Sequence, residues 1–417
     1  MAYNLLRKIY YSNVDAYEAT YQERFHSEYT HHIDFQIGSS DAFFVVTPQI
    51  HQKMLTIQKA DKIVFALQED LPTKAIQQFS ARCLIDEIVL TNNIEGVHST
   101  RKEIGGILSN LEKQDKRTRF HGLVRKYLML QSEEAIPVVS CEDVRQIYND
   151  LALKEVVEDN PENMPDGKIF RKGSVSVQSP TQKEIHQGVY PEEKIISTME
   201  QALCYLNDEN EELLYRTAVF HYLLGYIHPF YDGNGRLNRF ISSYMLAQEL
   251  EPVLSYRLSY TIKENLDKYY EAFKICNHPL NRGDLTPFVE MFLDIIEKSI
   301  LTLVDALKKR QEQLLHYVSH INFLPGTDDS VCWNLYSILI QAQLFSEQGI
   351  STRDLLSRLD ISRDTLRRKL EIVDNAGLLK KDRLKKENFY GINLTMLDEF
   401  ITWRKKRIGE TAQTGTN

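Results

Sequence analysis

One short segment, residues 228–239, carries side chains that suit the transfer of a phosphate-containing group. It holds a histidine, an aspartate, a Gly-Asn-Gly turn and two arginines, which are His228, Asp232, Gly233, Asn234, Gly235, Arg236 and Arg239. A neutral imidazole can accept the proton of an attacking hydroxyl. A carboxylate can hold Mg²⁺ that is shared with phosphate oxygens. The glycines can expose successive backbone N–H groups, and two guanidinium groups beside them suit a di- or triphosphate.

The elements on either side place this segment between two helices. Residues 211–227 carry apolar side chains at helical spacing, and Pro229 ends that helix because the residue before a proline disfavours the helical conformation. A second helix is predicted to start near Arg236. Helix N-termini carry unpaired N–H donors and a partial positive charge, so the turn between the helices predicts an anion site. A Gly-Asn-Gly turn alone, or a histidine before proline alone, is more typical of ordinary structure.

The whole segment resembles the signature of Fic-domain proteins, HPFx(D/E)GNGRxxR. Every fixed position is present, in His228, Pro229, Phe230, Asp232, Gly233, Asn234, Gly235, Arg236 and Arg239. The resemblance covers roughly residues 48–300. It implies an all-α Fic fold with a small β-hairpin flap. It also implies ATP as the usual nucleotide and transfer of AMP to a Ser, Thr or Tyr hydroxyl of a target protein.

The resemblance implies roles for the matched residues. The catalytic residues would be His228 as the general base, Asn234 bound to the transferring phosphate, and Arg236. The nucleotide would be bound by Phe230, Asp232, Gly233, Asn234, Gly235, Arg236 and Arg239. Within this set Asp232 would be the metal ligand for Mg²⁺, and Phe230 would pack in the core and fix the loop. Catalysis would then consist mainly of positioning and charge stabilisation.

A second match to the family lies upstream, at residues 91–96. Thr91, Glu95 and Gly96 match the inhibitory motif of Fic proteins, (S/T)xxxE(G/N). By spacing alone, Glu95 would be an exposed carboxylate at a helix end. The resemblance implies instead that Glu95 forms a bidentate pair with Arg239 and occupies the arginine that the γ-phosphate of ATP needs.

The flap and the target are predicted from residues 159–192, which are rich in Asn, Pro, Gly and Gln. Polar and apolar residues alternate over 174–177, which indicates a short strand. With Arg171, this strand resembles the flap of the family. The target backbone would bind as an added strand near Val175–Val177. Residues 178–188 depart from the family pattern, so the sequence does not indicate which protein is modified.

The C-terminal part predicts a winged helix-turn-helix over residues 330–394, which many Fic proteins carry at this end. Helices are expected from Thr352 and over 363–375, followed by a basic wing. The basic side chains are Arg363, Arg367, Arg368, Lys369, Lys380, Lys381, Arg383, Lys385 and Lys386. They could contact DNA phosphates, but acidic residues dilute their charge, and winged helices also dock proteins. Both interpretations stay open.

Composition bounds the remaining expectations. The chain has 417 residues, 42% of them hydrophobic, and a net charge of −8, so no global attraction to nucleic acid or anionic membranes is expected. Its five cysteines are scattered without a CxxC motif, and no apolar leader or membrane span is evident, which predicts a cytoplasmic protein. Residues 1–45 are expected to be irregular. A homodimer is left open.

The expected layout has five parts. They are an N-terminal helical region with the inhibitory helix (1–120), the Fic catalytic core (121–300), a connecting helix and linker (301–329), a winged helix-turn-helix (330–395) and a C-terminal tail (396–417). The favoured function is an autoinhibited protein adenylyltransferase. The alternatives are a DNA-binding transcriptional regulator with the Fic domain as nucleotide sensor, and an enzyme that removes AMP from proteins with Glu95 orienting water. No GxxxxGK(S/T) motif is present, which argues against a Walker-type ATPase.

Overall fold

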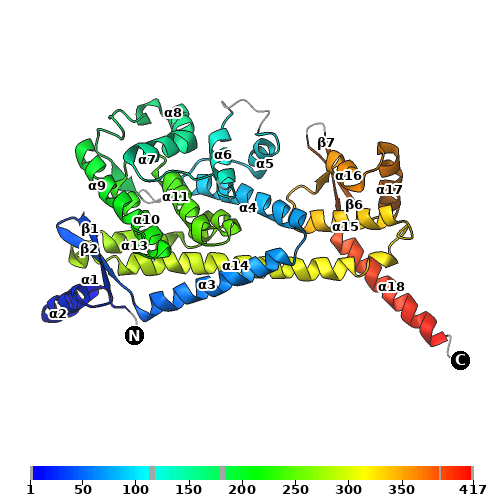
Figure 1. Ribbon diagram of the computed structural model, residues 1–417, viewed down its shortest axis with the longest axis horizontal. Coiled ribbons are helices and arrows are strands. Elements are labelled where there is room, and N and C mark those ends of the chain that lie inside the picture. The colour runs from blue at the N-terminus through cyan, green and yellow to red at the C-terminus, as the bar shows by residue number, and fades with distance from the viewer. Residues whose placement is uncertain (1–2, 112–117, 133, 179–183, 385–386, 415–417) are drawn as a thin grey trace. The chain divides into compact units, whose positions relative to one another are not determined.

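The computed structural model describes residues 3–111, 118–132, 134–178, 184–384 and 387–414 (Figure 1). They fold into two compact units. Unit 1 comprises Met1–Ile63 and Cys83–Leu303, and unit 2 comprises Val64–Arg82 and Val304–Asn417. Three long helices contribute residues to both units, namely α3 (Pro48–Glu69), α4 (Thr73–Ile94) and α14 (Thr286–Val318). The prediction of a mainly helical fold with a small β-hairpin is confirmed, whereas the five domain boundaries stay a prediction.

The N-terminal residues correct the sequence analysis, which expected residues 1–45 to be irregular. They form α1 (Leu6–Ser12), α2 (Val14–Phe25), β1 (Thr30–Ile37) and β2 (Ser40–Val45). The two strands pair antiparallel around a turn in which Gly38 has a positive φ. In β1, Ile33, Phe35 and Ile37 are buried and the residues between them are exposed. This period-two pattern was readable in the sequence and was missed.

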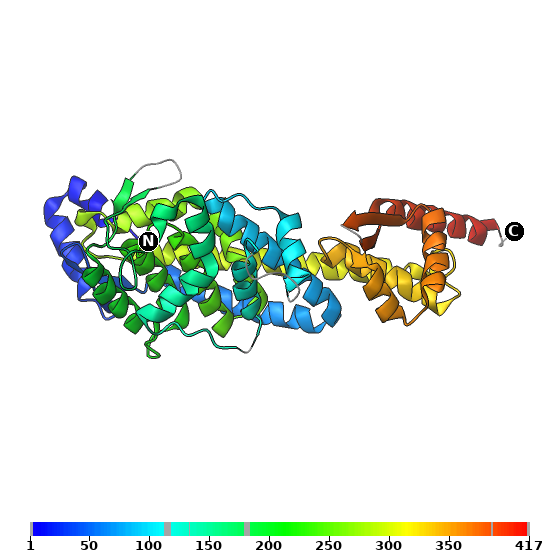
Figure 2. The ribbon, with the colours of Figure 1, turned by 90° about the horizontal axis from the view of Figure 1, so that it is seen from above.

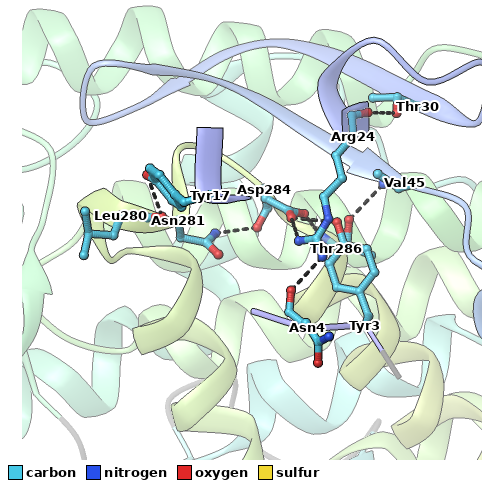
Figure 3. A network of polar contacts seen from close by, with 10 residues as sticks. All are labelled: Tyr3, Asn4, Tyr17, Arg24, Thr30, Val45, Leu280, Asn281, Asp284 and Thr286. Atoms are coloured by element: carbon cyan, nitrogen blue, oxygen red, sulfur yellow. Dashed lines mark hydrogen bonds and ion pairs between the residues drawn. The ribbon is translucent and has the colours of Figure 1, made fainter. Parts of the chain in front are cut away.

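A buried carboxylate, Asp284, anchors these N-terminal elements to the start of α14 (Figure 3). Its Oδ2 accepts hydrogen bonds from the Tyr3 hydroxyl at 2.7 Å and from Arg24 Nη1 at 3.3 Å, while Oδ1 accepts from the Thr286 N–H at 3.0 Å. Burial raises the pKa of Asp284, and these donors only partly offset that effect. Strand β2 is tied to the same loop, because the Leu285 N–H donates to the Phe43 carbonyl at 2.7 Å.

The centre of unit 1 is a pair of buried helices, α10 (Leu213–Ile227) and α11 (Asn234–Glu249). Helix α10 is apolar nearly all round and is buried on nearly every face, as expected for a core helix. Each buried leucine or isoleucine stabilises the fold by roughly 1.5–3 kcal/mol. The surrounding elements are α9 (Glu192–Leu206), α12 (Leu258–Glu264), α13 (Leu266–Cys276) and the 3₁₀ turns at Pro252–Tyr256 and Pro279–Asn281.

A second layer of short helices covers α11 and its preceding loop. It comprises α5 (Arg101–Leu108), α6 (His121–Met129), α7 (Cys141–Tyr148), a π-helical turn (Asn149–Leu153), α8 (Lys154–Asp159) and a 3₁₀ turn (Pro161–Asn163). Helix α7 begins with a complete capping box, in which Ser140 and Asp143 satisfy each other's backbone N–H groups. Helix α7 passes directly into the π-helical turn at its C-terminal end.

The flap is a short antiparallel hairpin of β3 (Ser176–Gln178) and β4 (Glu184–Gln187). Figure 2 shows both strands projecting from the edge of the helices of unit 1. The strand predicted over 174–177 is thus present, displaced by two residues at its start. Part of the segment without a family match, residues 179–183, lies outside the described residues.

The C-terminal elements of unit 2 follow the order expected for a winged helix. They are a 3₁₀ turn (Ile321–Phe323), α15 (Ser330–Phe345), β5 (Ile350–Ser351), α16 (Thr352–Leu359), α17 (Arg363–Asn375), β6 (Leu379–Leu384) and β7 (Glu387–Ile392). Ser351 and Ser362 cap α16 and α17, and the strands pair antiparallel in the order β5-β7-β6. The last helix, α18 (Leu394–Thr414), falls mostly within the predicted tail 396–417.

Of the expected basic side chains, Lys369 needs correction, and two others lie outside the described residues. Lys369 is not exposed on α17, since its Nζ pairs with Asp329 Oδ2 at 2.7 Å and its side chain is 24% exposed. Lys385 and Lys386 lie outside the described residues. Arg363, Arg367 and Arg368 are exposed. No described helix has the length and apolar character needed to cross a membrane.

Candidate active site

The loop between α10 and α11 is held in shape by its own side chains. Phe230 is fully buried and stacks on Tyr148, with ring centroids 3.6 Å apart. The Asn234 amide closes the loop, because its Oδ1 accepts from the Phe230 N–H at 3.0 Å and its Nδ2 donates to the Phe230 carbonyl at 2.9 Å. A bond from Asn234 to a phosphate would therefore use its second amide N–H.

The first turn of α11 contains a buried arginine with unpaired nitrogens. Gly233, in the left-handed conformation at φ 79°, is the N-cap of α11, and the N–H groups of the first helical turn have no partner within the helix. Arg236 is 1% exposed, and its Nε and Nη1 have no hydrogen-bond partner among the described residues. Buried guanidinium groups without partners are costly, so this arrangement suits a bound anion that supplies the missing acceptors.

Arg239, one turn later, is already occupied. Its Nη2 donates to Glu95 Oε1 at 2.8 Å and to the Thr91 carbonyl at 3.0 Å, and its Nε donates to Thr91 Oγ1 at 2.8 Å. The pair with Glu95 is thus a single hydrogen bond and not the bidentate pair that was expected. Burial lowers the pKa of Arg239, but attraction to Glu95, Tyr269 and Tyr270 and the hydrogen bond to Glu95 together outweigh this, so the pKa is raised overall.

Two glycines permit Glu95 to approach the loop. Helix α4 ends at Ile94, and Gly96 adopts the left-handed conformation at φ 75°, so the chain turns away directly after Glu95. A Cβ atom on Gly235 would lie only 2.1 Å from Glu95 Oε1. The glycine in the middle of the loop therefore makes space for the carboxylate as well as exposing an N–H group.

His228 is the residue at which α10 stops. It adopts the left-handed conformation at φ 52°, which is uncommon for a residue with a side chain. Burial, followed by the nearby His186 and Arg171, lowers the pKa of His228 to about 3. The imidazole is therefore neutral at pH 7 and able to accept a proton. Negatively charged phosphates bound beside it would raise this pKa and strengthen the base.

One cavity, of about 100 Å³, unites much of the predicted site. Its lining includes six predicted residues, which are Glu95, Val177, His228, Asn234, Gly235 and Arg239. Tyr269, Tyr270, Phe273 and His186 add an aromatic wall that the sequence analysis did not name. Phe230, Asp232, Gly233 and Arg236 belong to the same loop without lining the cavity, and Thr91 and Gly96 act on it from α4.

Asp232 fits a shared magnesium ion and not a site made by the protein alone. One carboxylate oxygen accepts from the Gly233 N–H at 2.5 Å. Among the described residues no group of three or more acidic, histidine or cysteine side chains could hold a metal ion. Mg²⁺ is commonly held by one or two carboxylates together with substrate phosphates, so a lone Asp232 beside an anion site is compatible with that arrangement.

Two buried glutamates support the site and were missed from the sequence. The Glu192 carboxylate accepts from the backbone N–H groups of residues 168–170 at 2.8–2.9 Å, and despite burial these donors lower its pKa. Glu87 accepts from Ser259 N at 3.0 and 2.9 Å, and burial raises its pKa to about 7. Spacing could have identified Glu87, because it lies four residues before Thr91 on the helical face that also carries Glu95.

Comparisons with known proteins agree with this geometry. A model of the Fic/DOC family matches residues 139–246. The chain is 34% identical over 99 residues to "Protein adenylyltransferase Fic" of Drosophila yakuba and to that of Drosophila melanogaster, in matches that cover 23% of this chain and 18% of each fly protein. It is 22% identical over 190 residues to "Protein adenylyltransferase fic-1" of Caenorhabditis elegans, covering 44% of this chain and 35% of the worm protein.

Among solved structures, a Fic family protein from Desulfovibrio desulfuricans G20 aligns with a TM-score of 0.49 at 21% identity, over 84% of this chain and 97% of that chain. The chain spans less than a fifth of the length of the fly relatives it matches. The family match extends from α7 through α8, the flap, α9 and α10 to most of α11, and it includes the whole loop from His228 to Arg239. Residues 139–246 of this chain therefore form a Fic/DOC domain.

Proposed function

We propose that this protein transfers AMP from ATP to a hydroxyl side chain of a target protein. The observation that carries the proposal is Arg236, a buried guanidinium with two unpaired nitrogens at the start of α11, in the loop that begins at the neutral His228. The loop thus combines an unpaired guanidinium, the unpaired backbone N–H groups of the first turn of α11 (the N–H nest) and a neutral base. This combination suits an anionic substrate that is attacked by a neutral nucleophile. The names of the fly and worm relatives support the same reaction.

In the proposed reaction the target hydroxyl oxygen attacks the α-phosphorus of ATP. Its proton passes to the His228 imidazole, and the bond between the α-phosphorus and the bridging oxygen breaks. Pyrophosphate leaves with that electron pair, held by the N–H nest of the loop and by Arg236. Asp232 would hold Mg²⁺, which would neutralise phosphate charge when bound. The target backbone would add to the flap beside Val175–Val177.

The same site is proposed to be inhibited by α4. Glu95 occupies Arg239 through the 2.8 Å hydrogen bond, and Thr91 holds the same side chain through its hydroxyl and carbonyl. With Arg239 engaged, the γ-phosphate would lack its partner, and ATP would bind with its α-phosphorus out of line. A bound phosphate and the Glu95 carboxylate would compete for one guanidinium.

The reaction is tested with ATP labelled at either the α- or the γ-phosphate. Wild-type protein and the Glu95→Gly variant, incubated with Mg²⁺ and a cell extract, should incorporate the α-label and not the γ-label into protein. His228→Ala should abolish incorporation while calorimetry still detects ATP binding, because the base acts on the hydroxyl and not on the nucleotide. Incorporation of the γ-label would indicate a kinase, and full activity in His228→Ala would refute the mechanism.

A second candidate is removal of AMP from modified proteins. It is favoured by one observation, that Glu95 lines the same cavity as His228. A carboxylate there could orient water toward a phosphodiester. Incubation of AMP-modified protein with wild type and with Glu95→Gly distinguishes the two functions, because removal requires Glu95 whereas transfer is inhibited by it.

The nucleotide-sensor hypothesis places the function in the C-terminal module. Exposed Arg363, Arg367 and Arg368 on α17 support contact with DNA, and the pairing of Lys369 with Asp329 weakens it. The intact His228 favours an enzyme over a sensor, which needs no base. The cytoplasmic location and a homodimer stay predictions.

A further inference from the structure

Arg171 is a buried cation with an unusual set of partners. It is fully buried, and no carboxylate pairs with it in the part of the chain that the structure describes. Each of its three guanidinium nitrogens donates to a different backbone carbonyl. Nε donates to His228 at 2.9 Å, Nη2 to Val189 at 2.8 Å, and Nη1 to Gly173. Burying an uncompensated charge is costly, so a side chain kept in this position has a role beyond filling space.

The three carbonyls belong to the parts of the site that must act together. Gly173 lies just before β3 and Val189 just after β4, so the guanidinium joins both ends of the flap. The third carbonyl belongs to His228, whose left-handed backbone is otherwise unfavourable for a residue with a side chain. The Arg171 N–H also donates to the Pro229 carbonyl at 3.2 Å.

Neighbouring contacts leave little freedom in this arrangement. The Val189 N–H donates to the Ile227 carbonyl at 3.1 Å, and the Gly188 N–H donates to the Val175 carbonyl at 3.0 Å. A Cβ atom on Gly188 would lie 2.6 Å from Arg171 Nη2 and 3.3 Å from His228 Cβ. The guanidinium therefore fits only because residue 188 has no side chain.

We propose that Arg171 is a positioning residue that fastens the flap and the general base to each other. Through its three carbonyl contacts, the backbone of His228 and the two ends of the target-binding hairpin are set by one rigid group. Lysine cannot replace it, because a single ammonium does not reach three carbonyls in fixed directions as the planar guanidinium does. The part of the proposal that concerns catalysis rests on the proposed AMP transfer, and the part that concerns the geometry does not.

The test uses the full-length protein with Arg171→Lys, Arg171→Met, Gly188→Ala and a matched control, Arg145→Met. Arg145 also donates to a backbone carbonyl, that of Ile169 at 2.5 Å, but contacts neither His228 nor the flap. Two measurements are independent of activity. Hydrogen exchange of the peptide that carries the Gly188 and Val189 amides reports the flap, and the histidine NMR signal that disappears in His228→Ala reports the base.

In both Arg171 variants the Gly188 and Val189 amides should exchange at least about tenfold faster than in wild type, and the His228 NMR signal should shift. The affinity for ATP, measured by calorimetry, should stay within about twofold of wild type. The turnover number for AMP transfer should fall about 100-fold with little change in the KM for ATP. Arg145→Met should leave the exchange and the signal as in wild type. Gly188→Ala keeps every charge and should give the same signature as the Arg171 variants, more weakly.

The proposal is overturned if Arg171→Lys folds and its flap amides exchange no faster than those of the control Arg145→Met, with the His228 NMR signal at the same position in both variants. If Arg171→Met does not fold, Gly188→Ala decides, and a wild-type flap and signal in that variant would refute the coupling. If His228→Ala transfers AMP as fast as wild type, the proposed function fails, yet the exchange and NMR measurements still decide the role of Arg171.

Discussion

Removing the Glu95 carboxylate should release the site from inhibition and raise the rate of AMP transfer. The size of the increase can be estimated from the geometry of the Glu95–Arg239 pair. Glu95 meets Arg239 through one hydrogen bond of 2.8 Å, with Arg239 1% exposed and Glu95 19% exposed. A charge-assisted hydrogen bond of this kind contributes about 1.5–3 kcal/mol. That range corresponds to about a 10- to 150-fold increase in AMP transfer for Glu95→Gly. A fully buried bidentate pair would have implied more.

The increase should appear in turnover and not in ATP affinity, since Arg236 and the backbone N–H groups bind phosphate in both states. Glu95→Gln keeps the shape and a neutral hydrogen bond, so it should recover only about a five- to tenfold increase. Arg239→Ala would break the same pair but also remove the γ-phosphate contact, so it should not activate. Initial rates of labelling with α-labelled ATP at saturating concentration measure these differences.

The control is Asp86→Asn. Asp86 lies on α4, and its carboxylate pairs with Arg101 at 2.7 Å. If Glu95→Gly labels no faster than wild type, while its stability and ATP binding match wild type, α4 does not inhibit the site. Equal activation by both variants would show that general loosening of α4, and not the release of Arg239, raises the rate.

Three further predictions follow from the charges. Because the lowered pKa of His228 keeps its imidazole neutral, kcat/KM for transfer should be flat between about pH 5.5 and 8, and an acid limb near pH 6.5 would contradict the assignment. Glu192→Gln should destabilise unit 1 by about 1–3 kcal/mol at pH 7 in urea unfolding. Because the pKa of Glu192 is lowered in the folded state, the ionised carboxylate stabilises the fold above about pH 4.3, and this stabilisation is lost as the pH falls through the folded pKa. The difference in stability between wild type and Glu192→Gln should therefore shrink on acidification, and a difference that grows would refute this account. If the C-terminal module binds DNA, replacing Arg367 and Arg368 together by alanine should weaken a low-salt gel shift on random duplex and reduce its salt dependence, whereas no shift by wild type would favour protein docking.

Much of the site could be read from the sequence because its residues are adjacent in the chain. His228, Asp232 and Arg236 fall within one loop, and a proline and a helical apolar pattern place that loop at a helix start. The pairing of Glu95 with Arg239 depended on resemblance to a family, since no local pattern joins residues so far apart. The prediction of two hydrogen bonds between Glu95 and Arg239 was wrong, because Thr91 binds the same guanidinium, and this competition cannot be read from spacing.

Other features depend on tertiary contacts that a single sequence does not express. In the sequence Glu192 looks like an ordinary surface charge, and Arg171 stands out only by its resemblance to the flap of the family. Both are nevertheless buried against backbone groups of distant segments. The hairpin of β1 and β2 was missed although its alternation was legible, because the histidine and tyrosine clusters around it obscured the pattern.

The π-helical turn between α7 and α8 gives this site a dependence on segment length. A Cβ atom on Gly233 would lie 3.1 Å from Ala152 Cβ and 3.2 Å from a ring carbon of Tyr148, so both side chains pack against the catalytic loop from the π-helical segment and its flank. Such a turn holds one residue more than an α-helical turn. Loss of one codon here would rotate Tyr148 by about 100° relative to Val156 and carry its ring off Phe230. In a population of variants, a single-codon deletion over residues 149–153 should therefore be as rare as a substitution in the motif itself, although it removes no reactive group.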